Sequence, residues 1–580
     1  MDKSDNIKKQ KIKNNKRKEK ENRLKKKKKI NINFTILAIV LIAIFCVCIT
    51  PITLQNDTYY TIKIGELIKN NGIDMMDHFS WHENLSYTYP HWLYDFLTYL
   101  VYSIAGFKGI YVVTCILSAM LGISVFMVNS KITKSKAISF VITVGVMYAL
   151  KPYIAARAQL VTFILFIWEL FFIEKFIENR KIIYAVLLIG ISIFIANLHV
   201  ATWPFFFVLF LPYIGEYFIA VISDIIIYKK IRELVIKHKM KIAQKKNNLD
   251  RLKKLQIKLD EQYDKNKKIE EKRENTNKNS YKIILKRNEN VKFLIIVMII
   301  CAFTGLITPL GDTPYTYLYK TMQGNTTENI SEHLPLTLID NTEAICSLVI
   351  VLAILIFTKT KIKLSDLFLV TGLCYLMFAT RRQFSMFVLL GSVVLGRMII
   401  DLINRYSKDG LKDVEEIVKN NIVLVLVSIL MLIFSYNSIK PRLEDKFVSE
   451  KSYPVVACDY ILENIDLSTA RFYNEYNYGS YMLFRGIPVF IDSRADLYAP
   501  EFSGKDEDIF SDFINTSSIS KYYEDTFEKY NITHVILGKK SKTNMLINKS
   551  HDENYKEIYS DDNFVIYERL NVNTQNENND

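Results

Sequence analysis

Long apolar runs, separated by clusters of Lys and Arg, dominate this chain. Half of its 580 residues are hydrophobic, and the charged residues gather between the apolar runs. A helix of about 20 apolar residues is long enough to cross a bilayer, where every backbone polar group has to be satisfied inside the helix. The pattern predicts a mainly α-helical, polytopic transmembrane bundle.

Eleven apolar runs are candidates for transmembrane helices. They lie at residues 34–54, 109–129, 137–152, 158–174, 182–198, 203–227, 293–309, 344–358, 365–380, 383–400 and 421–437. Several are shorter than the roughly 20 residues that a perpendicular span requires, so their boundaries are approximate. The first run is too long and too far from the N-terminus for a typical cleaved signal, and we interpret it as a retained helix.

The net charge of +15 indicates membrane topology and no nucleic-acid partner. The first 29 residues hold fifteen Lys and Arg, and 22 more lie between Lys229 and Lys292. The predicted outer segments carry few, as the positive-inside rule requires. The alternation holds only if residues 92–106 do not cross, so we expect there an interfacial helix that ends at Gly106.

These spans define the predicted domains. Residues 1–33 form a basic, disordered cytoplasmic tail, and residues 34–437 form the membrane domain. Within the latter, residues 55–108 make a large first outer loop and residues 228–292 a charged helical insertion in the cytoplasm. Residues 438–580 mix short strand and helix patterns and are too polar for the bilayer. They predict a small α/β domain outside the cell membrane, one that folds by itself.

The first outer loop is rich in groups that enzymes use. Between Gln55 and Asp95 lie Asp57, Glu66, Asp77, His78, His82 and His91. A long loop with this composition favours a function, yet Trp, Tyr and His also suit the membrane interface for amphipathic reasons. Composition leaves a site and an amphipathic collar equally open. Seven Cys, mostly inside apolar runs and without a CxxC, indicate neither a disulfide framework nor a metal site.

An ordered set of short motifs runs from about residue 50 to 500. It comprises Asp57, GELIKNNGI at 65–73, DHFSW at 77–81, HWLYD at 91–95, GFKG at 106–109, ARAQLVTF at 156–163, NLHVA at 197–201, TPLG at 308–311, ISEHLP at 330–335, RRQFSMF at 381–387, YNYGSYMLF at 476–484 and VFIDSRADLY at 489–498. The set resembles a mostly uncharacterised bacterial branch of the C-type glycosyltransferases (GT-C), with Ala158, Tyr478 and Ser493 departing from its pattern. Each motif alone is weak, and their order gives the resemblance its specificity.

The resemblance implies an integral membrane glycosyltransferase. Such an enzyme takes a sugar from a polyprenyl-phosphate-linked donor on the outer face and transfers it to a glycan, lipid or protein acceptor of the cell envelope. It implies Asp57 as general base, with Asp77 and Glu332 as further catalytic carboxylates. The residues expected to bind substrate are His91, Arg157, His199, Arg381, Arg382, Asp492 and Arg494.

Each of these roles has a simpler alternative. Asp57 could be the N-cap of the helix that follows it. Arg157, Arg381 and Arg382 fall at predicted outer helix ends, where guanidinium groups suit a phosphate but also reach lipid headgroups. Asp492, Arg494 and Asp496 form a charged cluster that could reach over the catalytic site or simply be an ion-paired turn. No ligand spacing identifies a metal, so a divalent metal stays open and no cofactor is assigned.

Two other functions fit the same composition. The first is a transporter or flippase of lipid-linked glycans, and the second is a catalytically inactive GT-C-like scaffold of an envelope complex. Transporters favour broken helices and polar groups at mid-membrane in repeated halves. Here the polar residues lie mainly at predicted outer helix ends and no internal repeat is seen, which favours the enzyme.

Overall fold

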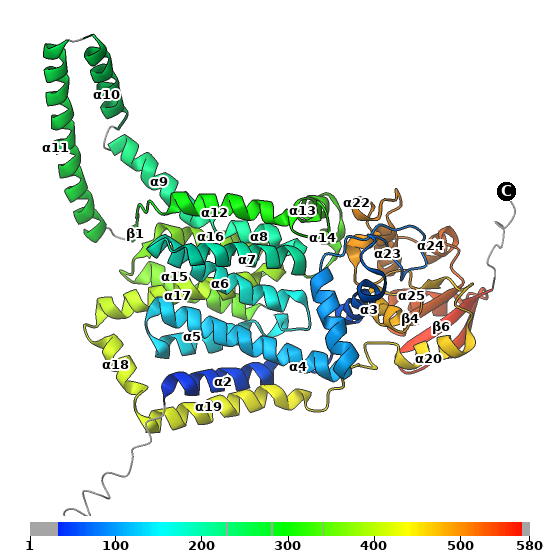
Figure 1. Ribbon diagram of the computed structural model, residues 1–580. Helices are drawn as coiled ribbons and strands as arrows, with labels where there is room; N and C mark the ends of the chain where they lie inside the picture. Colours follow the sequence, from blue (N-terminus) through cyan, green and yellow to red (C-terminus); the bar gives the residue numbers. More distant parts are fainter. Residues whose placement is uncertain (1–32, 228–229, 247, 280–281, 340, 571–580) are drawn as a thin grey trace, which may run out of the picture.

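The computed structural model describes residues 33–227, 230–246, 248–279, 282–339 and 341–570. The predicted basic tail lies outside this range, apart from Asn33, whose side chain caps the first helix by accepting from the Thr35 N–H. The predicted mainly helical fold is confirmed, and a small sheet domain follows it (Figure 1).

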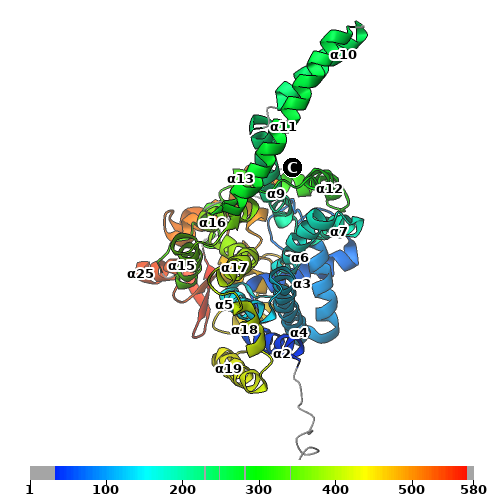
Figure 2. The ribbon, with the colours of Figure 1, turned by 90° about the vertical axis from the view of Figure 1, so that its left-hand side faces the viewer.

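A bundle of apolar helices makes up most of the molecule. Its members are α2 (Phe34–Ile49), α4 (Trp92–Thr133), α5 (Lys136–Ala149), α6 (Ala158–Asn179), α7 (Ile182–Leu198), α8 (Trp203–Val208), α9 (Leu211–Ile227), α12 (Val291–Phe303), α15 (Thr342–Phe357), α16 (Leu364–Ala379), α17 (Phe384–Tyr406) and α19 (Asn421–Ile439). Their facing sides bury large side chains such as Phe45, Phe126 and Phe163. Figure 2 looks along these helices, most of which lie nearly parallel.

Four helical segments are long and apolar enough to cross a membrane. They are Trp92–Thr133, Val200–Ser223, Arg381–Tyr406 and Asn421–Arg442. Six shorter apolar helices lie beside them, and each of the eleven predicted runs falls on a helix of the bundle. A short helix can span only where the bilayer thins or its flanks contribute. The number of spans therefore stays a prediction.

Helix α4 contains a break at Gly106. The backbone there has φ 58° and ψ −154°, a conformation that glycine adopts without steric cost. Before the break the helix runs across the end of the bundle, and after it the helix runs along the bundle (Figure 1). The predicted helix end at Gly106 is confirmed, while its place at a membrane interface stays a prediction.

The C-terminal domain is built on a mixed sheet. Its strands β3 (Phe472–Tyr473), β4 (His534–Gly538), β5 (Tyr555–Ser560) and β6 (Phe564–Arg569) lie in the order β3-β4-β6-β5. Only β3 and β4 are parallel, and Val535 pairs with Tyr567 in the central antiparallel ladder. Its helices are α20 (Val455–Asn464), α21 (Tyr476–Phe484), α22 (Pro500–Ser503), α23 (Ile509–Ser518), α24 (Tyr523–Lys529) and α25 (Lys542–Ser550).

The first loop and the C-terminal domain share one hydrophobic core. Helix α3 (Asn56–Asn71) of the loop buries Tyr59 edge-on against Tyr453 and Tyr481 of the domain, with ring centroids 5.0 and 5.1 Å apart. The Trp81 indole N–H donates to the Phe472 carbonyl at 2.9 Å. The two parts thus share one core, so we expect the C-terminal domain to depend on the first loop. Autonomous folding of residues 438–580 stays an untested prediction.

The bundle has two different ends. The C-terminal domain, α3, α13 (Thr313–Gln323) and α14 (Thr326–Asn329) lie at one, which we call the domain end (Figure 1). A long hairpin of α10 (Lys230–Lys245) and α11 (Leu249–Asn279) lies at the other, the hairpin end. There also lie α18 (Gly410–Ile417) and the two-residue pair β1 (Ile283–Ile284) and β2 (Ile362–Lys363).

Candidate active site

Asp57 lies in the first turn of α3 at the domain end. The N-cap of this helix is Gln55, so the alternative that Asp57 itself is the N-cap is wrong. Its carboxylate instead contacts Arg157, with 2.9 Å between Oδ2 and Nε. A carboxylate in a first turn is also stabilised by the helix dipole. Asp57 is thus held by Arg157, and its carboxylate oxygens do not cap the helix.

Arg157 joins two carboxylates from distant parts of the chain. It precedes α6 in an extended conformation, and its Nη1 lies 3.2 Å from Oε1 of Glu332. Burial alone would lower the pKa of the guanidinium, but Asp57 and Glu332 outweigh it and raise the pKa. Arg157 therefore stays charged and draws both acids to one point.

The backbone of Arg381 and Arg382 holds the loop that carries Glu332. The Arg382 N–H donates to the Glu332 carbonyl at 3.1 Å, and the Arg381 N–H to the Leu334 carbonyl at 2.9 Å. The Glu332 side chain is 48% exposed. Its burial raises the pKa of the carboxyl, but Arg157 and Arg382 outweigh that effect and lower it. Glu332 is thus an ionised and accessible carboxylate.

The two arginines of the pair have different surroundings. The Arg381 guanidinium lies on the surface and donates to the Pro335 carbonyl at 3.4 Å. Arg382 is half-buried and interacts electrostatically with Glu332, Arg157 and Asp57. Within the described part of the chain it forms no ion pair, so it is a cation available to an anionic ligand.

His91 and His199 form a ring pair beside this cluster. Their ring centroids are 4.9 Å apart, and Nδ1 of His199 lies 2.9 Å from the Thr162 hydroxyl. Burial, with Arg382 and Arg157 nearby, lowers the pKa of His91 to about 3. His91 is consequently neutral at physiological pH and offers a hydrogen bond without a charge.

Asp77, Asp492 and Arg494 form a second cluster, which is enclosed. Arg494 is 2% exposed and lies 2.7 Å from both Asp77 and Asp492. Its remaining Nε donates to Asp492 at 2.9 Å, and the Tyr498 hydroxyl donates to the same carboxylate. The cluster joins the first loop to the C-terminal domain, and this placement favours a structural role over contact with substrate.

Asp496, which the sequence grouped with Asp492 and Arg494, forms a third group with two residues that sequence reasoning missed, Tyr317 and Thr326. Its carboxylate accepts from the hydroxyls of Tyr317 and Thr326, and burial raises its pKa although these hydrogen bonds oppose the shift. Tyr317 also lines a cavity of about 260 Å³. That cavity lies between the first loop, α13 and α22, and among its lining residues are Tyr87, Lys320 and Glu501. No periodicity or motif marks Tyr317 in the sequence.

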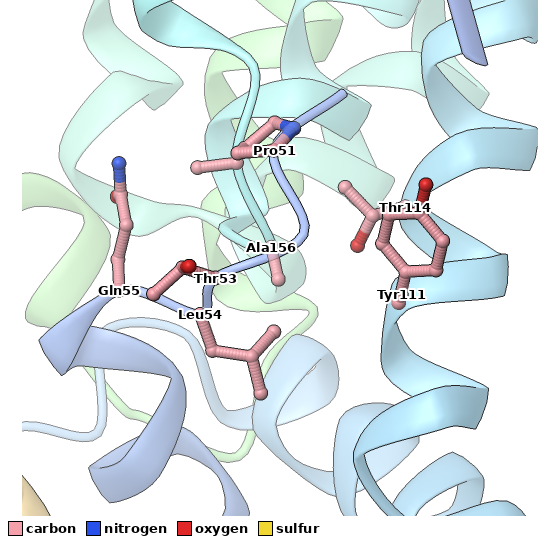
Figure 3. A pocket seen from close by; sticks show the side chains of 8 residues that line it. Pro51, Thr53, Leu54, Gln55, Tyr111, Thr114 and Ala156 are labelled. Carbon is pink, nitrogen blue, oxygen red and sulfur yellow. The ribbon is translucent and has the colours of Figure 1, made fainter. Parts of the chain in front are cut away.

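A smaller pocket lies just before α3 (Figure 3). Thr53, Leu54 and Gln55 line it on one side, and Tyr111 and Thr114 of α4 on the other. Its volume of about 10 Å³ has room for about one water molecule. Of the two cavities, only the larger one has room for a sugar ring.

The described residues contain no group of three or more His, Cys, Asp or Glu side chains arranged to hold a metal ion. Asp57 and Glu332 converge on a guanidinium instead, and an arginine can neutralise two carboxylates where a divalent cation otherwise would. Asp57, Arg157 and Glu332 therefore form a cluster of side chains with opposite charges.

No protein-family model and no curated protein sequence matches the chain. Among solved structures it is similar to the apo form of the oligosaccharyltransferase of Archaeoglobus fulgidus. The TM-score is 0.49 at 12% sequence identity, and the match covers 88% of this chain and 70% of that chain. A likeness of this size assigns no activity to the chain, so the function has to be argued from the site itself.

Proposed function

We propose that this protein is an integral membrane glycosyltransferase that uses a polyprenyl-phosphate-linked sugar as donor. The observation that carries the proposal is the convergence of Asp57, Arg157, Glu332 and Arg382 at one end of the bundle. These residues come from four segments that are far apart in the sequence. They combine two carboxylates with two arginines at the end of the bundle where, if the bundle spans a membrane, a lipid phosphate would lie.

The reaction needs a base and a cation. The bond between sugar C1 and the phosphate oxygen breaks, and a new bond forms between C1 and the acceptor oxygen. The proton of the acceptor hydroxyl passes to Asp57 or Glu332, and the polyprenyl phosphate leaves as an anion. Arg382, which has no ion pair in the described residues, is the cation best placed to receive that phosphate.

Arg157 could couple donor binding to the release of a general base. Its guanidinium contacts both carboxylates. A phosphate that binds to Arg157 competes for the same N–H groups and so releases one carboxylate for proton transfer. The neutral pair of His91 and His199 can then bind sugar hydroxyls without repelling either arginine.

Transport of lipid-linked glycans is the second candidate. Glu169 favours it, because this carboxyl is fully buried in α6 and has no hydrogen-bond partner among the described residues. Intramembrane acids often belong to a transport path. Yet the four residues of the proposed site, Asp57, Arg157, Glu332 and Arg382, lie at the domain end, where a transfer reaction can meet a water-borne acceptor. We therefore favour the enzyme, held in the membrane by the apolar helices of the bundle.

The test is the substitution Asp57→Asn, compared with Glu332→Gln and measured as envelope glycan product at matched protein abundance. Loss of a general base costs about 10²- to 10⁴-fold in rate. Glu66→Gln is the matched control, because Glu66 lies in the same helix and pairs with Lys63 at the surface. Its product should stay near normal.

One or both of Asp57→Asn and Glu332→Gln should lose most of the product. If both variants make normal amounts of every glycan that disappears when the gene is deleted, the catalytic assignment fails. If deletion instead leaves all glycan masses unchanged and lipid-linked precursors accumulate on one side of the membrane, the transporter replaces the enzyme.

A further inference from the structure

Helices α10 and α11 form a hairpin with an interface of its own. Ile236 and Ala243 of α10 are buried, as is Leu259 of α11. The Lys237 ammonium lies 5.6 Å from the Tyr263 ring centroid. These contacts cover one face of α10. The packing of the hairpin does not account for the side chains on the other faces.

The hairpin runs across the direction of the bundle helices. It lies at the hairpin end, and much of α10 reaches past the flank of the bundle, with α11 on the side farther from it (Figure 1). The end-on view agrees, since the hairpin there extends well beyond the outline of the bundle (Figure 2). If the bundle crosses a membrane, α10 lies parallel to the surface and over lipid, not over protein.

The uncovered faces of α10 are both apolar and basic. Leu234, Val235 and Ile242 are 66%, 45% and 41% exposed. Three further exposed side chains, those of Lys239, Lys241 and Lys245, lie among them. Over its length α10 has six Lys and Arg residues but one acidic residue, Glu233. An exposed apolar stripe within a strongly basic helix is typical of binding to a membrane surface.

We propose that α10 binds the anionic lipid surface beside the bundle. Leu234, Val235 and Ile242 insert between headgroups, and the lysines around them contact lipid phosphates. The orientation of the hairpin supplies the geometry, and the excess of positive charge supplies the preference for anionic lipid. This inference depends on the bundle being embedded in a membrane but not on glycosyl transfer.

The experiment uses the full-length protein in liposomes of phosphatidylcholine alone or of phosphatidylcholine with 30% phosphatidylglycerol, the latter fraction chosen as roughly that of an anionic membrane. An environment-sensitive fluorescent amino acid replaces Ile242, which leaves the native cysteines intact. The matched control carries it at Ile257 of α11, which is also apolar and 59% exposed. We expect a blue shift, and quenching by a headgroup-region lipid quencher, at position 242 in anionic liposomes only.

Two further measurements test the electrostatic part. The triple variant Lys239→Gln, Lys241→Gln and Lys245→Gln should lose the blue shift. That variant could also weaken the hairpin. The protein that keeps all three lysines is therefore measured at increasing salt concentration as well, and the blue shift should fall as salt screens the lipid charge.

Three outcomes would overturn the proposal. Equal signals at positions 242 and 257 would mean that α10 does not face the bilayer. A shift that persists without phosphatidylglycerol, or at high salt, would exclude charge-dependent lipid binding. A shift that occurs in detergent and grows with protein concentration would mean that a second copy of the chain covers α10.

Discussion

At the scale of the residue, the shape of one side chain sets the candidate site. The fork of Arg157 reaches Asp57 through Nε and Glu332 through Nη1. A guanidinium can bind two oxygen acceptors in fixed directions, whereas an ammonium is a single point charge. The site therefore depends on the geometry of the cation and not only on its sign.

The substitution Arg157→Lys tests this geometry. Losing one charge-assisted hydrogen bond costs about 1.5–3 kcal/mol, which corresponds to about 10- to 150-fold in glycan product. Arg180→Lys is the control, because Arg180 follows the other end of α6 and stacks on the Phe293 ring at 4.1 Å. Full activity of Arg157→Lys would show that its charge alone suffices.

The neutral state of His91 predicts a pH effect on stability. Its pKa of about 3 lies below the value of about 6.5 in the unfolded chain, so between these values the unfolded state binds more protons. The contribution of His91 is complete above pH 6.5 and declines as the pH falls toward 3. Replacing His91 with Gln should reduce this slope by at most about 1.4 kcal/mol per pH unit.

The measurement is the thermal midpoint of the detergent-solubilised protein at pH 7 and pH 5. His78→Gln serves as control, because His78 is a surface residue that pairs with Asp74 at 2.6 Å. A wild-type midpoint that is the same at both pH values would contradict the burial of a neutral His91.

At the scale of the element, the crossing of α3 and α4 positions Asp57. Gly65 lies at the crossing, and a Cβ atom added there would lie 2.1 Å from the Asp95 carbonyl oxygen. The two helices can approach this closely only without a side chain at that position. Asp57 begins the same helix, so the crossing fixes where its carboxylate points.

Gly65→Ala should therefore lower the thermal midpoint, because overpacking of this kind costs about 1–3 kcal/mol. Activity should fall with it as α3 is displaced. Gly190→Ala is the matched control, since an added Cβ in α7 meets nothing within 4 Å. An unchanged midpoint in Gly65→Ala would mean that α3 and α4 separate without cost.

The elements also show what the sequence could predict. The eleven apolar runs fall on helices, because the hydrophobicity of a run is a local property that can be seen in the sequence. The helix end at Gly106 could be predicted from a glycine between two helical patterns. The partners of those helices could not be read. The contact between Arg157 and Glu332 joins positions 175 residues apart, and no local pattern encodes it. The resemblance led to these two residues, but it did not distinguish them from the enclosed Asp77 and Arg494.

At the scale of the whole molecule, one core unites the first loop with the C-terminal domain. Tyr59, Ile62 and Ile64 of α3 are buried together with Phe472, Phe490 and Ile536. The composition change after residue 437 marks where the membrane helices end. It does not mark the edge of this core, because buried residues of the first loop, from Leu54 to Tyr89, belong to it as well.

A fragment of residues 442–575 is accordingly expected to lack cooperative unfolding and to be cleaved readily by protease. Without α3 and the loop, Tyr453 and Tyr481 lose their main aromatic partner and the ion pair of Arg494 with Asp77 is absent. The checks are thermal melting by circular dichroism and limited proteolysis. Cooperative unfolding of the fragment would restore the autonomous domain.

The shared core also sets an order of events during synthesis. Leu54 accepts a hydrogen bond from Tyr453, 399 positions later in the chain. At about 5–20 residues per second, the ribosome needs roughly 20–80 s to cover that distance. For this whole interval the first loop lacks the partner that covers Tyr59 and Trp81. If the loop lies outside the membrane, as the charge pattern predicts, its aromatic side chains stay exposed there until the C-terminal domain is made.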